Sequence, residues 1–324
     1  MQYTDIAVIG AGLAGVSCAR QLAAAGRQVT VFDKSKGMGG RMATRRGDDF
    51  SVDHGAQYFT AQQPDFHAEI HAWQAAGLCA PWQARLVQHR PTGPVDGYPE
   101  HRYVATPGMS SLCRALAAAL PVQLNHRLTA LQRQADGWQL SFADQPSWRA
   151  RQVLLAAPAP QATALLDAAP ALRALAAGVE MEACWAVMLH AQAPLEIGFD
   201  AAWVEHGPLR WLARNSSKPG RSGAESWLLH ATPAWSAAHI DAPADEVAGL
   251  LHAAFAELVD SAVDARNRSA HRWLYAQAAQ PLDIGSAYQA ELGLGLCGDW
   301  CLGTRVEDAW RSGRHLAGQL LAAS

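Results

Sequence analysis

The fold is decided by residues 6–33, which read IAVIGAGLAGVSCARQLAAAGRQVTVFD. The largely apolar run at residues 5–10 predicts a buried strand, and the alanine- and leucine-rich run at residues 13–25 predicts a helix. Residues 28–33 are rich in β-branched and aromatic side chains, which predicts a second strand. A strand, a helix and a strand in this order form a βαβ unit, so the expected class is α/β with a parallel sheet.

Three glycines lie at the turn between the first strand and the helix. Gly10 permits the tight turn, Gly12 lets the backbone approach a pyrophosphate, and Gly15 lets the helix and strand pack closely. The first N–H groups of the helix are free to bind an anion. Asp33, at the end of the next strand, would accept hydrogen bonds from ribose hydroxyls. The pattern predicts a dinucleotide site, and by itself it does not separate NAD from FAD.

Length and composition set the broad class. The chain has 324 residues, of which 50% are hydrophobic and 17% charged, so it is long enough for two globular domains. The net charge of -3 provides no basic surface for a phosphate backbone, so no nucleic-acid partner is expected.

The six cysteines are scattered over a long chain, which favours a reducing cytoplasm over a disulfide framework. Cys297 and Cys301 have no second pair to complete a zinc site, so no metal is expected. The uncharged run at residues 6–19 follows Asp5 and contains regularly placed glycines, which argues against a signal peptide. No other run approaches the roughly 20 apolar residues of a membrane span. A soluble protein without membrane contact is therefore expected.

The rest of the chain predicts a return to the first sheet and then a second domain. Residues 91–107 are read as connections rich in proline and glycine. The expected helices are 66–76, 107–119, 244–259 and 306–322, and the expected strands are 122–131, 138–142, 152–156, 184–190, 226–231 and 293–297.

Three further features favour FAD. In the loop at residues 39–42, Arg41 could pair with the same pyrophosphate, although a flexible turn is the alternative. Residues 53–59, DHGAQYF, combine small and aromatic residues suited to a flat ring, although a core strand would look similar. Residues 298–300, Gly-Asp-Trp, lead into the last helix. N–H groups near residues 305–307 could stabilise negative charge on a reduced flavin, unless this is an ordinary turn.

Together these residues resemble the amine-oxidase-like FAD superfamily, and most closely the bacterial renalase family. The resemblance covers nearly the whole chain. The matching stretches are 32–42, 55–60, 107–110, 156–160, 211–215, 271–276 and 297–301. The glycine motifs are shared by the whole superfamily, whereas the last three of these stretches are more specific.

The resemblance implies a two-domain flavoprotein like p-hydroxybenzoate hydroxylase, with a Rossmann-like FAD-binding domain and an α+β substrate domain that contains an antiparallel sheet. The FAD domain is expected at residues 1–62, 103–160 and 287–324, and the substrate domain at 63–102 and 161–286. The implied reaction is oxidation of 2- and 6-dihydro-NAD(P) isomers to NAD(P)+ by hydride transfer to flavin N5, with O2 reduced to H2O2. Hydride transfer needs alignment and no general base, so no catalytic acid or base is assigned.

The expected contacts fall into two sets. FAD, bound non-covalently, is expected to contact Gly10, Gly12, Leu13, Ala14, Gly15, Asp33, Lys34, Gly40, Arg41, Met42, Gly55, Ala56, Gln57, Tyr58, Leu128, Asp299, Arg305, Val306 and Glu307. The dinucleotide substrate is expected to contact Gln57, Tyr58, Phe59, Trp185, Arg214, Asn215, Trp273 and Tyr275. His230 and His271 are read as structural histidines.

The lysines help to distinguish between the possible functions. The chain has three, Lys34, Lys36 and Lys218. Many amine-oxidase relatives place a lysine close to flavin N5. Lys218 is expected in an exposed loop, which counts against a typical amine oxidase. Together with Arg210, Arg214 and Arg221 it forms a basic cluster that could bind a dinucleotide, although a solvated basic loop is the commoner interpretation. The alternatives left open are a flavin amine oxidase or carotenoid-type desaturase of the same fold, an NAD-dependent dehydrogenase, and a FAD-binding interaction module without turnover.

Overall fold

The computed structural model describes residues 2–47, 50–97 and 100–323. It divides into two compact units. The first comprises Met1–Arg41, Leu112–Met181 and Gln277–Ser324, and the second comprises Met42–Ser111 and Glu182–Ala276. The predicted division into a cofactor domain and a substrate domain is a functional one, and it stays a prediction.

The first unit is built on one mixed sheet with the order β10-β11-β12-β1-β2-β9, in which β19 also pairs with β12 and with β18. The strands β9, β2, β1, β12 and β19 pair in parallel, whereas β10 and β11 form an antiparallel meander onto β12. The strands are β1 (Gln2–Ile9), β2 (Val29–Phe32), β9 (Val122–Gln123), β10 (Arg127–Gln134), β11 (Gly137–Ala143), β12 (Gln145–Leu155), β18 (Ala287–Gln289) and β19 (Leu294–Leu296).

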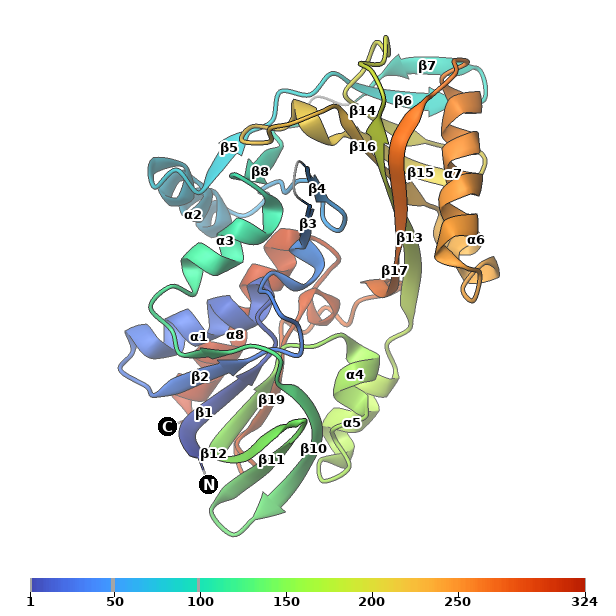
Figure 1. Ribbon diagram of the computed structural model, residues 1–324. Helices are drawn as coiled ribbons and strands as arrows, with labels where there is room; N and C mark the ends of the chain where they lie inside the picture. Colours follow the sequence, from blue (N-terminus) through green and yellow to red (C-terminus); the bar gives the residue numbers. More distant parts are fainter. Residues whose placement is uncertain (1, 48–49, 98–99, 324) are drawn as a thin grey trace. The chain divides into compact units, whose positions relative to one another are not determined.

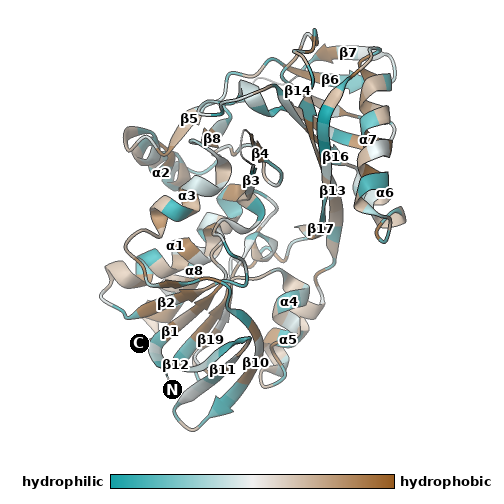
Figure 2. Ribbon diagram, viewed as in Figure 1, coloured by the Kyte–Doolittle hydropathy of each residue, from teal (hydrophilic) through white to brown (hydrophobic). Residues whose placement is uncertain are grey.

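Helices cover both faces of this sheet (Figure 1). α1 (Leu13–Ala24) and α8 (Val306–Ala322) pack on the face that carries Ile6 and Val8. α4 (Ala159–Thr163) and α5 (Pro170–Ala177) pack on the face that carries Ala7 and Ile9. Because both sets of alternating side chains are buried in β2 and in the second half of β1, these segments are largely apolar, and they are mostly brown in Figure 2. The predicted βαβ unit and the Rossmann-like α/β class are confirmed.

Two predictions of local structure were wrong. The strand expected at residues 122–131 is two strands, because Asn125 adopts a left-handed turn with φ 56° between β9 and β10. The segment 91–107, read as connections only, contains β7 (Gly93–Asp96) and β8 (Tyr103–Ala105). These short strands exist through pairing with β6 (Leu86–Arg90) and β5 (Cys79–Pro81), and their own sequences carry little strand signal.

The second unit is built on a seven-stranded sheet with the order β17-β13-β16-β15-β14-β6-β7. The pairs that join β13, β16, β15 and β14 are antiparallel, whereas β14 and β6 run parallel. An antiparallel sheet in the second part of the chain was predicted, and it is confirmed. The bounds are β13 (Met181–Ala191), β14 (Ala201–Val204), β15 (Leu209–Arg214), β16 (Ser226–Ala231) and β17 (Ala265–Ala278).

The two faces of the second sheet are covered differently. Helix α7 (Ala244–Leu258) packs on the face that carries Val187 and Leu229, and α6 (Pro233–Ala238) precedes it (Figure 1). On the opposite face, Met188 and Leu228 contact Val52 of β4. The remaining elements are η1 (Gly40–Met42), β3 (Thr44–Arg46), β4 (Ser51–Asp53), α2 (Pro64–Ala75), α3 (Met109–Leu116), η2 (Asn215–Ser217) and η3 (Asp299–Cys301). None of the helices within the described ranges is long and apolar enough to cross a bilayer.

Candidate functional site

At Gly10 and Gly15 the turn between β1 and α1 has no room for a side chain. A Cβ atom on Gly15 would lie 2.0 Å from the carbonyl oxygen of Gly10, and one on Gly10 would lie 2.4 Å from the carbonyl oxygen of Ala156. The helix begins at Leu13, and its N-cap, Gly12, has no side chain that could cap the first N–H groups. The end of the helix is thus held against the strand with its donors free for an anion.

A second glycine loop closes on the first. The Gly39 N–H donates to the Ala11 carbonyl at 3.0 Å. A Cβ on Gly40, whose φ is +52°, would lie 3.4 Å from Gly12 Cα. Two glycine backbones therefore face each other beside the first turn of α1, in a cradle that side chains would fill. This arrangement fits a pyrophosphate group, which needs N–H donors at close range.

Asp33 lies directly after β2, as predicted, and is 8% exposed. Its Oδ2 accepts the Ala11 N–H at 2.7 Å, and its Oδ1 accepts the Ser35 N–H at 2.8 Å. These bonds fix the carboxylate at the glycine turn. Each oxygen keeps a further lone pair, so the group can still accept hydrogen bonds from ribose hydroxyls. The next residue, Lys34, is exposed and donates to Gln161 Oε1 at 3.1 Å.

Arg41 and Asp299, two of the predicted cofactor contacts, bind each other. Arg41 Nη1 donates to Asp299 Oδ2 at 2.9 Å, and Nη2 donates to Oδ1, so the pair is bidentate. The Asp299 side chain is 8% exposed and that of Arg41 29%. The carboxylate therefore holds the guanidinium in one orientation, and the arginine side chain stays partly exposed.

The other predicted contacts of the first unit lie on β10 and at the start of α8. Leu128 sits at an irregularity in the pairing of β10 with β11. Arg305 is the N-cap of α8, and its N–H donates to Asp308 Oδ2 at 2.9 Å. Glu307 is buried in the same turn. Two acidic residues here stabilise the helix and offset the positive potential of its N-terminus, so this end is a weaker anion site than α1.

Arg41→Ala is expected to weaken FAD retention, because it removes a cation at the glycine cradle and leaves Asp299 without its partner. Charge-assisted hydrogen bonds contribute about 1.5–3 kcal/mol, which corresponds to a rise of roughly 10- to 150-fold in the FAD dissociation constant. Fluorescence titration of the apoprotein with FAD measures this dissociation constant. Arg173→Ala, at an exposed ion pair of α5, is the matched control and should leave the FAD dissociation constant unchanged. Equal dissociation constants in the two variants would contradict the role of Arg41.

In the second unit, the side chain of Asp53 is fully buried at the end of β4. Its Oδ1 accepts the Thr44 hydroxyl at 2.7 Å and the Met109 N–H at 2.9 Å. Its Oδ2 contacts Arg221 and lies 3.5 Å from Lys218 Nζ. Burial alone would raise the pKa of Asp53, but Lys218, Arg221 and the hydrogen bonds outweigh it and hold the pKa below its usual range.

Lys218 was predicted to be exposed, and this was wrong. Its side chain is fully buried, with Nζ 2.9 Å from Gln57 Oε1 and 5.4 Å from the centre of the Trp82 ring. Burial lowers the pKa of Lys218 to about 8, since the attraction of Asp53 only partly offsets burial and the repulsion of Arg221. The Asn-Ser-Ser-Lys-Pro-Gly sequence is typical of a surface loop, and the carboxylate that holds the lysine lies far away in the chain.

Gln57 and Asn215 use their amide groups to hold the backbone around Asp53. Gln57 Nε2 donates to the carbonyls of Asp53 and Gly55 at 2.8 and 2.9 Å. Asn215 Oδ1 accepts the Asp53 N–H at 3.1 Å, and its Nδ2 donates to the Ser51 carbonyl at 2.8 Å. Both residues were predicted to contact substrate, but their amides are engaged within the protein.

Four rings gather around the backbone of His54, and we call them the His54 cluster: His54, His230, His271 and Trp273. The His54 ring stacks on Trp273 at 5.2 Å with 23° between planes, and it meets His271 edge-on at 4.9 Å. Trp273 Nε1 donates to the His54 carbonyl at 2.8 Å, and His230 Nε2 lies 3.4 Å from the same oxygen. The buried Nδ1 of His54 has no hydrogen-bond partner, so it can still pair with a ligand or water.

The imidazoles of the His54 cluster are neutral at physiological pH. Burial, followed by the nearby His271 and Arg45, lowers the pKa of His54 to about 3. Burial likewise lowers the pKa of His230 to about 4, with Lys218 adding to the effect, and it lowers that of His271. The cluster is therefore uncharged and lies in a region of positive potential.

Other predicted substrate contacts lie elsewhere in the second unit. Trp185 packs in the core beneath α7 and donates to the His239 carbonyl at 3.0 Å. Arg214 Nη2 donates to the Ile197 carbonyl at 2.8 Å, and its guanidinium lies 5.1 Å from the Trp227 ring in the same core. The structure does not bring these two side chains to the His54 cluster.

The remaining predicted side chains have other neighbours. Tyr58 lies 5.4 Å from the Trp211 ring, and Tyr275 follows Trp273 by two residues on β17, on the same face of that strand. Phe59 is buried against Phe66 and Trp73 of α2, and Met42 is also buried. Sequence reasoning left out Thr44, which carries no motif of its own and donates to Asp53. His54 and Arg221 belong to stretches that the sequence singled out, but no contact was assigned to either.

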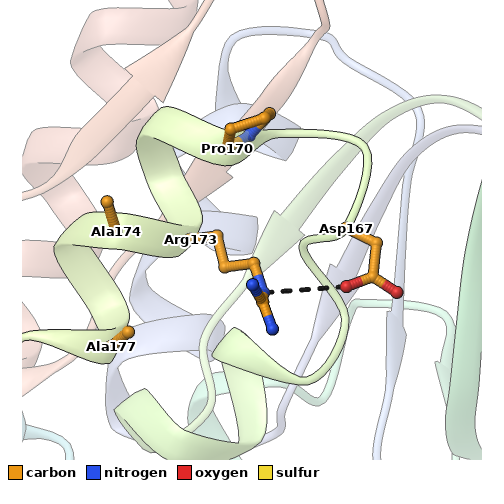
Figure 3. Close-up of a pocket in the computed structure, with 5 residues that line it drawn as sticks. All are labelled: Asp167, Pro170, Arg173, Ala174 and Ala177. Atoms are coloured by element: carbon orange, nitrogen blue, oxygen red, sulfur yellow. Dashed lines mark ion pairs between the residues drawn. The ribbon is translucent and has the colours of Figure 1, made fainter.

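A small hollow on the first unit is unrelated to these sites. It measures about 220 Å³ and is lined by Asp167, Pro170, Arg173, Ala174 and Ala177 (Figure 3). Its ion pair, 3.6 Å from Arg173 Nε to Asp167 Oδ1, joins side chains that are 55% and 90% exposed. Such a pair contributes little, and the hollow contains no predicted contact residue. Across residues 2–47, 50–97 and 100–323, no group of three or more His, Cys, Asp or Glu side chains is arranged to hold a metal ion.

Known proteins share the fold over the full length of the chain. The structure of a putative protoporphyrinogen oxidase from Exiguobacterium sp. 255-15 matches with a TM-score of 0.77 at 14% identity, covering 100% of this chain and 99% of that one. Cyclohexylamine oxidase from Brevibacterium oxydans IH-35A matches with a TM-score of 0.79 at 13% identity, covering 98% of this chain and 99% of that one. At these identities the likeness establishes the fold.

Curated relatives match only a short segment. A 4,4'-diapophytoene desaturase from Staphylococcus haemolyticus (strain JCSC1435) is 50% identical over 50 residues, which is 15% of this chain and 10% of the relative. The Staphylococcus aureus (strain Newman) desaturase is 38% identical over 65 residues, 20% of this chain and 12% of the relative. The matches thus span about a tenth of the length of these desaturases, and their activity does not carry over.

Two family matches cover most of the chain. Residues 8–71 match the NAD(P)-binding Rossmann-like domain, which agrees with the glycine cradle and Asp33. Residues 94–321 match the family described as flavin containing amine oxidoreductase. This second match spans more than half of the chain. The protein belongs to the family of flavin-containing amine oxidoreductases, with FAD as its cofactor.

Proposed function

We propose that the protein is an FAD-dependent oxidase that converts 2- and 6-dihydro isomers of NAD(P)H to NAD(P)+, with O2 reduced to H2O2, as the resemblance to bacterial renalases implies. We also propose that the protein acts in a reducing cytoplasm. Its six cysteines, all free, support this proposal.

The observation that carries the proposal is the His54 cluster. Its stacked His54 and Trp273 rings are flat and uncharged, a chemistry that suits the planar and uncharged ring of a dihydropyridine. The positive potential around it comes from Arg45, Arg210 and Lys218. Such a potential favours a substrate with an anionic pyrophosphate and disfavours a protonated amine.

The carboxylate of Asp53 also favours a dihydropyridine over an amine as substrate. Asp53 precedes His54 directly, but it is paired with Lys218 and Arg221. A protonated amine would have to break these pairs to reach it, leaving a buried cation without a partner, which costs several kcal/mol. The environment of Asp53 thus supports a substrate that needs no carboxylate.

The roles of the protein follow from its residues. The cradle of Gly12 and Gly40, with Asp33 and Arg41, would hold the ADP half of FAD, and the segment 55–58 is proposed to lie along the flavin ring. FAD supplies the hydride acceptor. The protein binds the cofactor and the substrate, aligns them and excludes water. No side chain has to move a proton from the carbon that is oxidised.

Turnover in air tests the proposal. Purified protein is supplied with 2-dihydro-NAD(P), 6-dihydro-NAD(P), ordinary NADH or a simple primary amine, and NAD(P)+ and H2O2 are quantified. We expect equimolar NAD(P)+ and H2O2 from at least one isomer, at a rate at least 10-fold above that with NADH or the amine, a difference of about 1.4 kcal/mol in barrier. Equal or faster oxidation of the amine would overturn it.

An amine oxidase is the second candidate, and a specific observation favours it. Lys218 is buried beside Gln57 instead of lying in an exposed loop, so the argument that the chain lacks an interior lysine no longer holds. The same assay decides between the two, because an amine oxidase would release an aldehyde or ketone and H2O2 from the amine and would leave the isomers unchanged.

A further inference from the structure

The buried cluster in the second unit contains more positive than negative charge. The side chains of Asp53 and Lys218 have no exposed surface and that of Arg221 is 1% exposed. One carboxylate thus faces two cations, so the cluster has a net charge of +1 when Lys218 is protonated. Burying an unpaired charge costs several kcal/mol. The excess charge is stable only if an anion is placed beside it or if one cation gives up its proton.

Lys218 is the cation that can lose its proton. Arg221 makes the closer pair with Asp53, through Nε at 3.2 Å and Nη2, and it also donates to the Ala105 carbonyl at 2.6 Å. A guanidinium does not deprotonate in proteins. Lys218 Nζ is more weakly held, at 3.5 Å from Asp53 Oδ2. His230 also interacts with Lys218 and is neutral.

Gln57 connects Lys218 to the proposed flavin segment. Its Oε1 accepts from Lys218 Nζ at 2.9 Å, and its Nε2 donates to the Gly55 carbonyl at 2.9 Å. Gly55 and Gln57 belong to the segment 55–58 that is proposed to lie along the ring. The amide is fully engaged, so a change in the charge of Lys218 acts on that segment through one fixed side chain.

We propose that Lys218 is a positioning residue whose charge balances the negative charge of the reduced flavin. An ammonium that is already present stays protonated, and a neutral amine takes up a proton when the flavin is reduced. This inference rests on the proposed place of the flavin ring beside residues 55–58. It does not depend on which donor reduces the flavin.

The electrons and protons balance as follows. A two-electron reduction with one proton, equivalent to a hydride, gives an anionic reduced flavin, and the donor is oxidised. When Lys218 starts neutral, its Nζ accepts one further proton from solvent and becomes an ammonium. Two electrons are then accompanied by two protons. When Lys218 starts protonated, only one proton is taken up.

The test is the midpoint potential of the FAD-loaded protein as a function of pH, measured under anaerobic conditions with a chemical reductant and a reference dye. For a two-electron couple, each proton taken up contributes about 30 mV per pH unit. In the range where reduced flavin is anionic, we expect a slope of about 30 mV per pH unit, steepening to about 60 mV above the pKa of Lys218, which is about 8.

Variants separate this role from a structural one. Lys218→Met should abolish the steepening, and Lys218→Arg, with a permanent charge, should also keep the shallow slope. Lys36→Met is the matched control at an exposed lysine and should retain the wild-type profile. A wild-type slope that stays near 30 mV throughout, or steepening that survives in Lys218→Met, would overturn the proposal. If the methionine variant does not retain FAD, the wild type and Lys218→Arg still decide.

The outcome is independent of the substrate. Steepening without turnover of any dihydro isomer would support the role of Lys218 and count against the proposed function. Isomer turnover with a constant slope would support the proposed function and count against the role of Lys218.

Discussion

Asp53→Asn is expected to lower the free energy of unfolding by about 3–5 kcal/mol, the cost of removing one partner from a buried ion pair. Asparagine keeps the size of the side chain and can still accept from Thr44, but it leaves Lys218 and Arg221 facing each other without a counter-charge. Urea unfolding followed by tryptophan fluorescence measures the loss, as a lower midpoint at unchanged slope.

The pH dependence gives this prediction a second readout. The pKa of Asp53 is below its ordinary value of 3.8 in the folded protein, so its contribution to stability is present above that value and is lost as the pH falls through the folded pKa. Asp53→Asn should lack this part of the acid sensitivity. Asp96→Asn, at an exposed aspartate of β7, is the control and should match the wild type. Equal stability of both variants would contradict the buried ion-pair account.

Gly15→Ala is expected to abolish FAD retention and to destabilise the first unit by about 1–3 kcal/mol, the usual cost of overpacking. The added Cβ would lie 2.0 Å from the carbonyl oxygen of Gly10, which is backbone of the turn, and 3.1 Å from Cβ of Ala156, which directly follows β12. The helix must therefore move away from the strand, and its first N–H groups move with it. Flavin absorbance after gel filtration and a thermal melt measure the two effects.

Gly318→Ala is the matched control for this prediction. Gly318 also lies in a helix of the first unit, α8, but nothing lies within 4 Å of an added Cβ. Alanine is a better helix former than glycine by about 1 kcal/mol, so this variant should be as stable as the wild type or more so and should retain FAD. If Gly15→Ala behaves in the same way, close packing at the turn is not what positions the cofactor.

The sequence predicts the first unit well because its signals are local. The strand before Gly10, the helix from Leu13 and the position of Asp33 each follow from residues that are neighbours in the chain. The helix at Val306–Ala322 was likewise predicted with its observed bounds. Short strands such as β7 and β8 were missed, because pairing with a partner creates them.

The buried cluster of the second unit could not be predicted, because its members lie far apart in the sequence. Asp53 and Lys218 are separated by 165 positions, and the composition around Lys218 is that of a loop. The same holds for His54, whose neighbours His230 and Trp273 come from β16 and β17. Only the three-dimensional pairing reveals that these polar groups are buried together.

The central claim is that the protein is a flavoenzyme reduced by dihydro-NAD(P) isomers, and an anaerobic absorbance titration tests it most directly. Purified protein is mixed with 2- and 6-dihydro-NAD(P), with ordinary NADH and a simple amine as controls. We predict that the flavin bands bleach rapidly with an isomer alone and return in air with formation of H2O2. Bleaching by the amine and by neither isomer would contradict the proposed function, and a protein that binds no flavin would contradict the whole account.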